Sequence, residues 1–245
     1  MHSDDEPVGR VLTRREVLAS LAAAGAAVIL PFPGKPGRLV LPGGTVLPAC
    51  VVRPAQTEGP YFVDEKLNRS DIRTDPSNGK VSDGALLDLT IRLSKVSGAS
   101  CVPLAGAVVD IWQCDAHGVY SDVSDINGKF TTVGQKFLRG HQVTGKEGEA
   151  RFRTVYPGWY EGRTVHIHFK VRTNPSGSRG TEFTSQAYFN DAFSDQVFAV
   201  APYAKGTRVL NEADDIFRAQ GGPQLILDVT RSATGYASTF EIGLS

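Results

Sequence analysis

The stretch that decides the fold reads Ala85-Leu86-Leu87-Asp88-Leu89-Thr90-Ile91-Arg92-Leu93-Ser94. From Leu87 onward, apolar side chains alternate with polar ones. Because neighbouring side chains of a strand point to opposite faces, this alternation predicts a strand with one buried face. Six further runs, each bounded by turn residues, are also predicted as strands. These runs are 107–112, 151–156, 164–172, 184–189, 224–229 and 238–242.

Helical periodicity is weak beyond the N-terminal region. It is visible only around Asp191–Phe198 and Glu212–Phe217. The 26 glycines and 14 prolines favour many short strands and turns over long helices. We therefore expect an all-β fold, an antiparallel β-sandwich with long loops and few short helices, rather than an alternating βαβ fold.

The charge balance excludes one broad class of function. Lys and Arg together number 26, and Asp and Glu together also number 26. A nucleic-acid binder needs a basic surplus to bind phosphates, so no nucleic-acid partner is expected. The hydrophobic content of 41% is enough to fill the core of a soluble globular protein.

The N-terminus carries the pattern of an export signal. Arg14 and Arg15 precede an uncharged run, 18–30, which is shorter than the about 20 apolar residues of a membrane span. An amphipathic helix is the alternative, but this run has no polar stripe. Paired arginines before such a run are typical of a twin-arginine signal. We expect a periplasmic or extracellular protein without stable membrane insertion after export. The expected parts are the signal 1–33, a Pro/Gly-rich linker 34–49 and one folded domain 50–245.

Three cysteines are present: Cys50, Cys101 and Cys114. An exported protein can keep a disulfide, and an odd count leaves at least one thiol over. The sequence leaves open which two cysteines pair. The absence of a Cys-x-x-Cys spacing argues against a structural zinc site.

A histidine pair gives the sharpest chemical signal, in the run Arg163-Thr164-Val165-His166-Ile167-His168-Phe169-Lys170-Val171. In a strand, the four apolar residues of this run point into the core, and His166 and His168 share the opposite face. Two imidazoles placed in this way can converge on one metal ion. The alternative is a pair of unrelated surface histidines.

The residues around the pair leave the metal open. A cupin-like site would need a Glu where Arg172 and Thr173 stand, and a zinc site would need a third imidazole such as His141. A facial triad would need a carboxylate such as Asp115 or Asp122. Two tyrosines have better local context, because they occupy glycine-containing turns at strand ends. They are Tyr120 and Tyr160, and each could also be a simple core aromatic.

Four sequence blocks, taken in order, resemble the intradiol ring-cleavage dioxygenases, which include protocatechuate 3,4-dioxygenases and catechol 1,2-dioxygenases. The resemblance extends over 57–203 and is greatest to exported, stand-alone members. The blocks are Trp112-x-Cys114-Asp115-Ala116-x-Gly118-x-Tyr120, Phe137-Leu138-Arg139-Gly140-x-Gln142-x-Thr144, Tyr156-Pro157-Gly158-Trp159-Tyr160 and Arg163-x-x-His166-x-His168.

This resemblance implies a non-haem Fe(III) site held by four ligands: Tyr120, Tyr160, His166 and His168. By position, Tyr120 and His168 would be equatorial, and Tyr160 and His166 axial. The chemistry agrees, because anionic phenolates stabilise a hard trivalent cation and neutral imidazoles complete its coordination.

The resemblance also implies oxygen-dependent cleavage of a catechol-type ring to a cis,cis-muconate-type diacid, with a small aromatic diol and molecular oxygen as partners. Tyr160 would leave the metal and accept a proton of the diol. Arg163 would stabilise carbanion-like charge on the ring. Gln186 resembles a pocket glutamine, and Tyr61 would line the pocket mouth. The identity of the diol and the oligomeric state stay open.

Two other functions fit parts of the sequence. A non-catalytic, transthyretin-like β-sandwich carrier would explain the strands and the signal, but not the tyrosine and histidine pattern. A zinc hydrolase would use His166, His168 and His141, and would be colourless and indifferent to oxygen.

Overall fold

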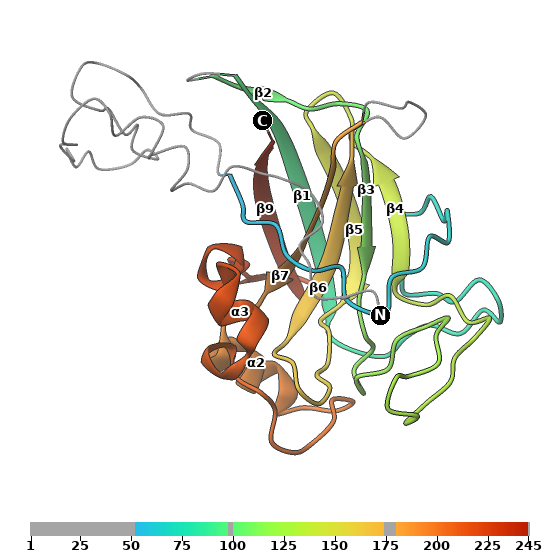
Figure 1. The fold of residues 1–245 in the computed structure, drawn as a ribbon. Coiled ribbons are helices and arrows are strands. Elements are labelled where there is room, and N and C mark those ends of the chain that lie inside the picture. Colours follow the sequence, from blue (N-terminus) through green and yellow to red (C-terminus); the bar gives the residue numbers. More distant parts are fainter. Residues whose placement is uncertain (1–51, 98–99, 174–179, 245) are drawn as a thin grey trace.

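The computed structural model describes residues 52–97, 100–173 and 180–244. They form two β-sheets packed face to face, with short helices beside one end of the sandwich (Figure 1). The all-β sandwich prediction is confirmed. The expected signal 1–33 and linker 34–49, and with them Cys50, lie outside the described residues.

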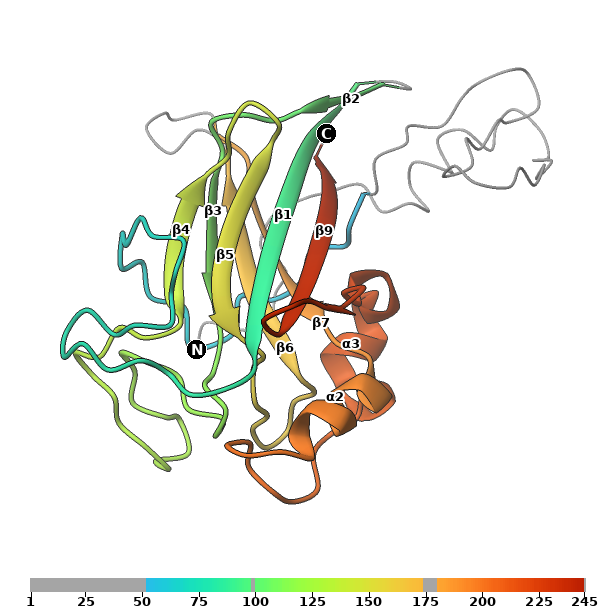
Figure 2. The ribbon, with the colours of Figure 1, turned by 180° about the vertical axis from the view of Figure 1, so that it is seen from behind.

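The first sheet is built around one long strand. Its members are β1 (Leu86–Ser97), β2 (Ser100–Pro103), β5 (Glu149–Val155), β8 (Thr230–Arg231) and β9 (Tyr236–Leu244). Strand β1 lies between β5 and β9 and pairs with both (Figure 2). The alternation in β1 holds in three dimensions, because its apolar side chains from Leu87 to Leu93 are at most 1% exposed.

The second sheet carries the histidine pair. Its strand order is β4 (Arg139–Val143), β3 (Val108–Trp112), β6 (His166–Arg172) and β7 (Glu182–Tyr188). Phe169 of β6 meets Phe240 of β9 with ring centroids 5.8 Å apart. The inner faces of the two sheets therefore share one apolar core.

Three details differ from the sequence prediction. Strands β2, β4 and β8 were not predicted. Strand β9 runs parallel to β1, so the sandwich is not wholly antiparallel. The predicted strand 224–229 is wrong, because Gly222–Leu225 forms a 3-10 turn (η3) with a proline at its start. Leu225 and Leu227 are buried in alternation, yet the backbone around them makes only a single bridge, between Ile226 and Tyr188. Period-two burial alone does not require a strand ladder.

The two predicted helical segments are helical in the structure. They correspond to α2 (Asp191–Phe198) and to the 3-10 turn η2 (Asn211–Ala213) followed by α3 (Asp215–Ala219). Asn190 and Asp214 cap the two α-helices with side-chain oxygens. Within the described ranges, no helix has the length and apolar character needed to cross a membrane.

Two of the three cysteines fall in the described residues. Cys101 is disulfide-bonded, and Cys114 is a buried free thiol. Burial raises the pKa of the Cys114 thiol, so this cysteine stays protonated and packs as a small apolar side chain.

The loops that carry the two tyrosines pack backbone against backbone. A Cβ atom added at Gly118 would lie 2.4 Å from the carbonyl oxygen of Trp159, and one added at Gly158 would lie 2.6 Å from that of Asp115. Gly118 also has a φ of +84°, which L side chains rarely adopt. These two glycines allow the loops of Tyr120 and Tyr160 to approach each other.

Replacing Gly118 by alanine should therefore destabilise the fold. Gly128 is a matched control, because its φ is +72° but no atom lies within 4 Å of an added Cβ. We expect Gly118→Ala to lower the free energy of unfolding by about 1–3 kcal/mol more than Gly128→Ala does. Chemical denaturation of both variants measures this difference. Equal losses would show that the loops do not need the close approach.

Candidate active site

Strand β6 is buried on both faces. Ile167, Phe169 and Val171 point into the sandwich core, as predicted. His166 and His168, on the opposite face, are each only 2% exposed. They are therefore not surface histidines, and their face of the sheet must be covered by other parts of the chain.

The cover comes from the segment before the first sheet. Glu58 pairs with Lys170 of β6, and the Lys170 ammonium also lies 4.1 Å from the ring centre of Phe62. Phe62 packs on Trp112, which stacks on His168 with ring centroids 4.9 Å apart and planes within 6°. These contacts hold the segment over the histidines and exclude water from them.

The four predicted ligands lie together in this covered space. The Nε2 atoms of His166 and His168 are 3.0 Å apart, and the Tyr160 hydroxyl lies 3.3 Å from Nε2 of His166. The Tyr120 ring lies 5.6 Å from that of Tyr160 and 6.2 Å from that of His168, centroid to centroid. Residues up to 48 positions apart along the chain thus place two phenols and two imidazoles around one point.

Hydrogen bonding fixes the orientation of one imidazole. Nδ1 of His166 donates to the carbonyl oxygen of Thr164 at 2.6 Å, which leaves the Nε2 lone pair facing the other three side chains. Nδ1 of His168 is buried without a hydrogen-bond partner among the described residues. Stacking on Trp112 holds that ring instead.

Burial keeps all four groups uncharged. Burial raises the pKa of Tyr160 to about 12 and that of Tyr120 well above its ordinary value, and the two phenols repel each other when charged. Burial, together with the charge of Arg163, lowers the pKa of His166 to about 3. The pKa of His168 also falls well below its ordinary value, first because of burial. The charge of Arg163 favours both phenolates but does not outweigh burial, so a bound cation would be needed to form them.

The arrangement fits such a cation. The Tyr120 hydroxyl is fully buried and meets hydrogen-bond geometry with no described residue. Metal–imidazole bonds of about 2.1 Å at right angles place two nitrogens about 3 Å apart, which is the spacing of the two Nε2 atoms. Two phenol oxygens and two imidazole nitrogens form a donor set suited to a hard trivalent metal.

The zinc alternative lacks its third ligand. In the described ranges, no group of three or more His, Cys, Asp or Glu side chains is placed to hold a metal ion. His141 stands on β4 opposite Asp110, whereas His168 stands opposite Trp112, so the two histidines occupy different levels of the sheet. The side chains that lie beside the two histidines and could complete a metal site are the phenols of Tyr120 and Tyr160.

Arg163 and Gln186 are in contact. Nη2 of Arg163 donates to Oε1 of Gln186 at 2.6 Å, and Gln186 itself is fully buried and stands opposite His168 in the β6–β7 ladder. Tyr61 is also in place, with its ring 4.7 Å from that of Tyr120 and its hydroxyl donating to Asp125 at 2.5 Å.

Sequence reasoning missed two contributors. Trp112 is part of a quoted block, but its stacking on His168 becomes visible only when β3 and β6 pair. Asp214 forms an ion pair with Arg163 at 2.8 Å. Its position just before a helical segment marks it as a helix cap, but no local pattern connects it with a residue 51 positions away.

One of the four side chains, Tyr160, borders a large cavity of about 730 Å³. Its lining includes Tyr61, Trp159, Tyr160, Arg163 and Ile216. The lining combines apolar rings with polar groups such as Arg163, as small-molecule sites do.

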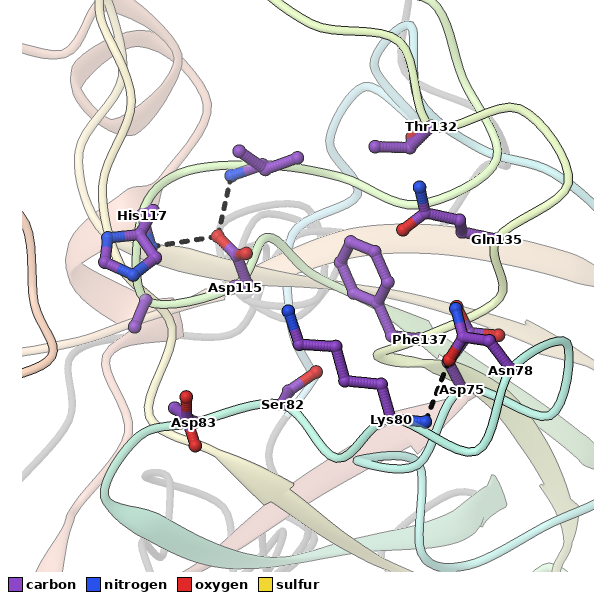
Figure 3. A pocket seen from close by; sticks show the side chains of 12 residues that line it. Asp75, Asn78, Lys80, Ser82, Asp83, Asp115, His117, Thr132, Gln135 and Phe137 are labelled. Atoms are coloured by element: carbon purple, nitrogen blue, oxygen red, sulfur yellow. Dashed lines mark hydrogen bonds between the residues drawn. The ribbon is translucent and has the colours of Figure 1, made fainter.

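A second cavity of about 190 Å³ lies behind the turn that precedes Tyr120 (Figure 3). Figure 3 shows Lys80, Asp115 and Gln135 around it. The Asp115 carboxylate accepts the backbone N–H groups of His117 and Val119 at 2.9 Å each, so it shapes the turn. None of the four candidate ligands lines this space. The larger cavity is therefore the candidate substrate site.

Comparison with known proteins identifies a family. A family model described as dioxygenase matches residues 57–242. Chlorocatechol 1,2-dioxygenase of Pseudomonas putida is 32% identical over 105 residues, which cover 35% of this chain and 36% of that protein. Catechol 1,2-dioxygenase 1 of Acinetobacter lwoffii is 26% identical over 155 residues, which cover 53% and 45%. The chain thus aligns with less than half the length of these curated relatives.

Solved structures align over more of their length. An intradiol ring-cleavage dioxygenase from Tetranychus urticae has a TM-score of 0.67 at 30% identity, covering 80% of this chain and 95% of that one. The dioxygenase domain of a carbohydrate-binding fusion protein from Streptomyces sp. SirexAA-E has a TM-score of 0.56 at 28% identity, covering 79% and 98%. Because the family model spans most of the chain, the protein belongs to the intradiol ring-cleavage dioxygenase family.

Proposed function

We propose that this protein opens catechol-type aromatic rings between their two hydroxylated carbons, using molecular oxygen and a non-haem Fe(III) ion. The ligands would be Tyr120, Tyr160, His166 and His168. The observation that carries the proposal is the convergence of one fully buried phenol, Tyr120, and one partly buried phenol, Tyr160, on two buried imidazoles whose Nε2 atoms are 3.0 Å apart. Family membership adds independent support.

The overall reaction is balanced without a further reductant. A catechol takes up both atoms of one oxygen molecule and becomes a cis,cis-muconate-type diacid. Bound Fe(III) would withdraw electron density from the chelated diol and so prepare its ring carbons for reaction with oxygen. The protein's part is to bind the diol, exclude water and place protons and charges.

Tyr160 is placed to receive a proton. It borders the cavity, whereas Tyr120 is fully buried behind it. With a pKa of about 12 in the absence of a cation, a Tyr160 oxygen released from the metal would readily take a proton from the incoming diol. Binding would then need no separate base.

Arg163 is placed to stabilise negative charge. It lines the cavity beside Tyr160. Burial opposes its charge, but the neighbouring tyrosines and Asp214 outweigh this effect, so the pKa of Arg163 lies above its ordinary value. A permanently charged guanidinium beside the bound ring would stabilise carbanion-like charge during the attack of oxygen.

The visible spectrum tests this proposal directly. Iron-loaded protein should be red-brown from phenolate-to-iron charge transfer, and anaerobic catechol should shift the band to longer wavelength. Tyr120→Phe should remove most of the band, because one phenolate is lost. Tyr236→Phe should leave the band unchanged, since that ring packs against Phe193 outside the site. With labelled oxygen, the product should contain both labelled atoms.

A protein that binds stoichiometric iron and stays colourless would contradict the tyrosinate site. A coloured protein that neither binds catechol nor consumes oxygen would instead favour the non-catalytic carrier.

We also propose that the chain is exported by the twin-arginine route and acts in the periplasm or outside the cell. The motif at Arg14 and Arg15 is the main support. The disulfide at Cys101 is consistent with it, because disulfides persist in oxidising compartments. Transport of a folded protein would also allow the metal to be acquired in the cytoplasm.

Conservative replacement of both arginines tests the export route. The double variant Arg14→Lys with Arg15→Lys should remain in the cytoplasm, because the transport machinery reads the arginine pair. Arg10→Lys, which lies outside the pair, should be exported normally. Cell fractionation followed by immunoblotting measures both. Equal export of the double variant and the wild type would exclude this route.

A further inference from the structure

One buried carboxylate outside the candidate ligand set is bonded to the cavity arginine. Asp214 is 0% exposed, and its Oδ2 atom accepts a hydrogen bond from Nε of Arg163 at 2.8 Å. Buried carboxylates are rare unless they are paired, so this ion pair is a built feature of the site.

The guanidinium is held on two sides. Asp214 holds Nε, and Gln186 accepts from Nη2 at 2.6 Å. Gln186 is itself anchored, because its amide nitrogen donates to the carbonyl of Thr57 and its oxygen also accepts from Tyr188. The planar fork of Arg163 is therefore fixed in direction as well as in place.

Asp214 has two further bonds, both to the backbone. Oδ2 accepts the N–H of Thr164 at 2.9 Å, and Oδ1 accepts the N–H of Phe217 at 2.9 Å as the cap of α3. The carbonyl oxygen of Thr164 in turn accepts a hydrogen bond from Nδ1 of His166. One carboxylate thus joins α3 to the arginine and to the start of β6.

We propose that Asp214 is a positioning residue that holds the Arg163 guanidinium against the substrate cavity. This inference rests on the proposed function, and it extends it to a residue that does not line the cavity. The ion pair also neutralises the charge of Arg163. Without its counter-charge, the largely buried Arg163 side chain would favour turning toward water, away from the bound ring.

Electrostatics supports this assignment. Burial alone would raise the pKa of Asp214, but Arg163 and the two backbone N–H donors hold that pKa below its ordinary value. Asp214 is therefore charged whenever the site is assembled. The alternative is that Asp214 is only a helix cap, and the experiment must separate these two roles.

The test uses Asp214→Asn, because asparagine is also a good helix cap. An amide has one acceptor oxygen, so it cannot accept from Phe217, Thr164 and Arg163 together. We expect the kcat for catechol to fall about 10- to 100-fold. The anaerobic dissociation constant for catechol, the charge-transfer band and the iron content should stay close to wild type.

Two comparisons make the result specific. Asn190→Ala removes the cap of α2, which does not touch Arg163, and should leave kcat unchanged. In an Arg163→Met background, Asp214→Asn should change kcat less than about 2-fold, because residues that act through one another are not additive. Thermal melting of each variant checks that the fold is intact.

The outcomes separate the two levels of the argument. An active wild type together with a fully active Asp214→Asn variant would overturn the positioning role and leave the proposed function standing. A loss that persists undiminished in the Arg163→Met background would assign Asp214 to capping alone. A wild type that forms the iron chromophore but does not open catechol would overturn the proposed function, and the positioning role with it.

Discussion

The rest of the site depends on the burial of four polar donors with too few partners of their own. Tyr120 and both imidazoles are buried and Tyr160 is partly buried, and desolvation raises the pKa of the two phenols and lowers the pKa of the two imidazoles. The Tyr120 hydroxyl and Nδ1 of His168 lack hydrogen bonds among the described residues. An unsatisfied buried polar group costs about 1–3 kcal/mol. Such a cluster is unfavourable unless something binds there, so the fold around it must be stable for other reasons.

That stability comes from the opposite face of the same strand. In β6, Ile167, Phe169 and Val171 belong to the sandwich core, while His166 and His168 alternate with them on the outer face. The period of two thus lets one short strand serve both purposes. The core fixes the register of β6 between β3 and β7, and this register sets the height at which Trp112 stacks on His168. A slip of one residue would turn both imidazoles into the core.

The sequence predicted what alternation and local motifs encode. The face of β6 that bears the histidines, the strand Leu86–Ser97 and the helix Asp191–Phe198 follow from periodicity. Tyr120 and Tyr160 followed from a family resemblance, because an isolated tyrosine in a turn indicates little by itself. The prediction for the segment 224–229 was wrong, since its buried leucines pack with only a single bridge to β7 and no strand ladder. Contacts between distant residues, such as Asp214 with Arg163, have no local signal, because only the assembled fold brings them together.

The charges around the cavity follow one logic if the site holds Fe(III). Two phenolates would leave one positive charge on a trivalent ion, and an unpaired Arg163 beside it would add a second. Like charges in a weakly screened interior repel strongly. Because Asp214 neutralises Arg163, the ion pair would repel the metal only weakly at longer range. The guanidinium could still donate hydrogen bonds to a substrate in direct contact with it. Arg139 presents the contrasting case: its 2%-exposed side chain donates to the backbone oxygens of Ser121 and Tyr61 and to the Ser121 hydroxyl. Burial lowers the pKa of Arg139 to about 10, and a Tyr120 phenolate formed on a bound metal would be the foremost charge opposing that shift. Arg139 and the metal would then both stabilise the same ligand.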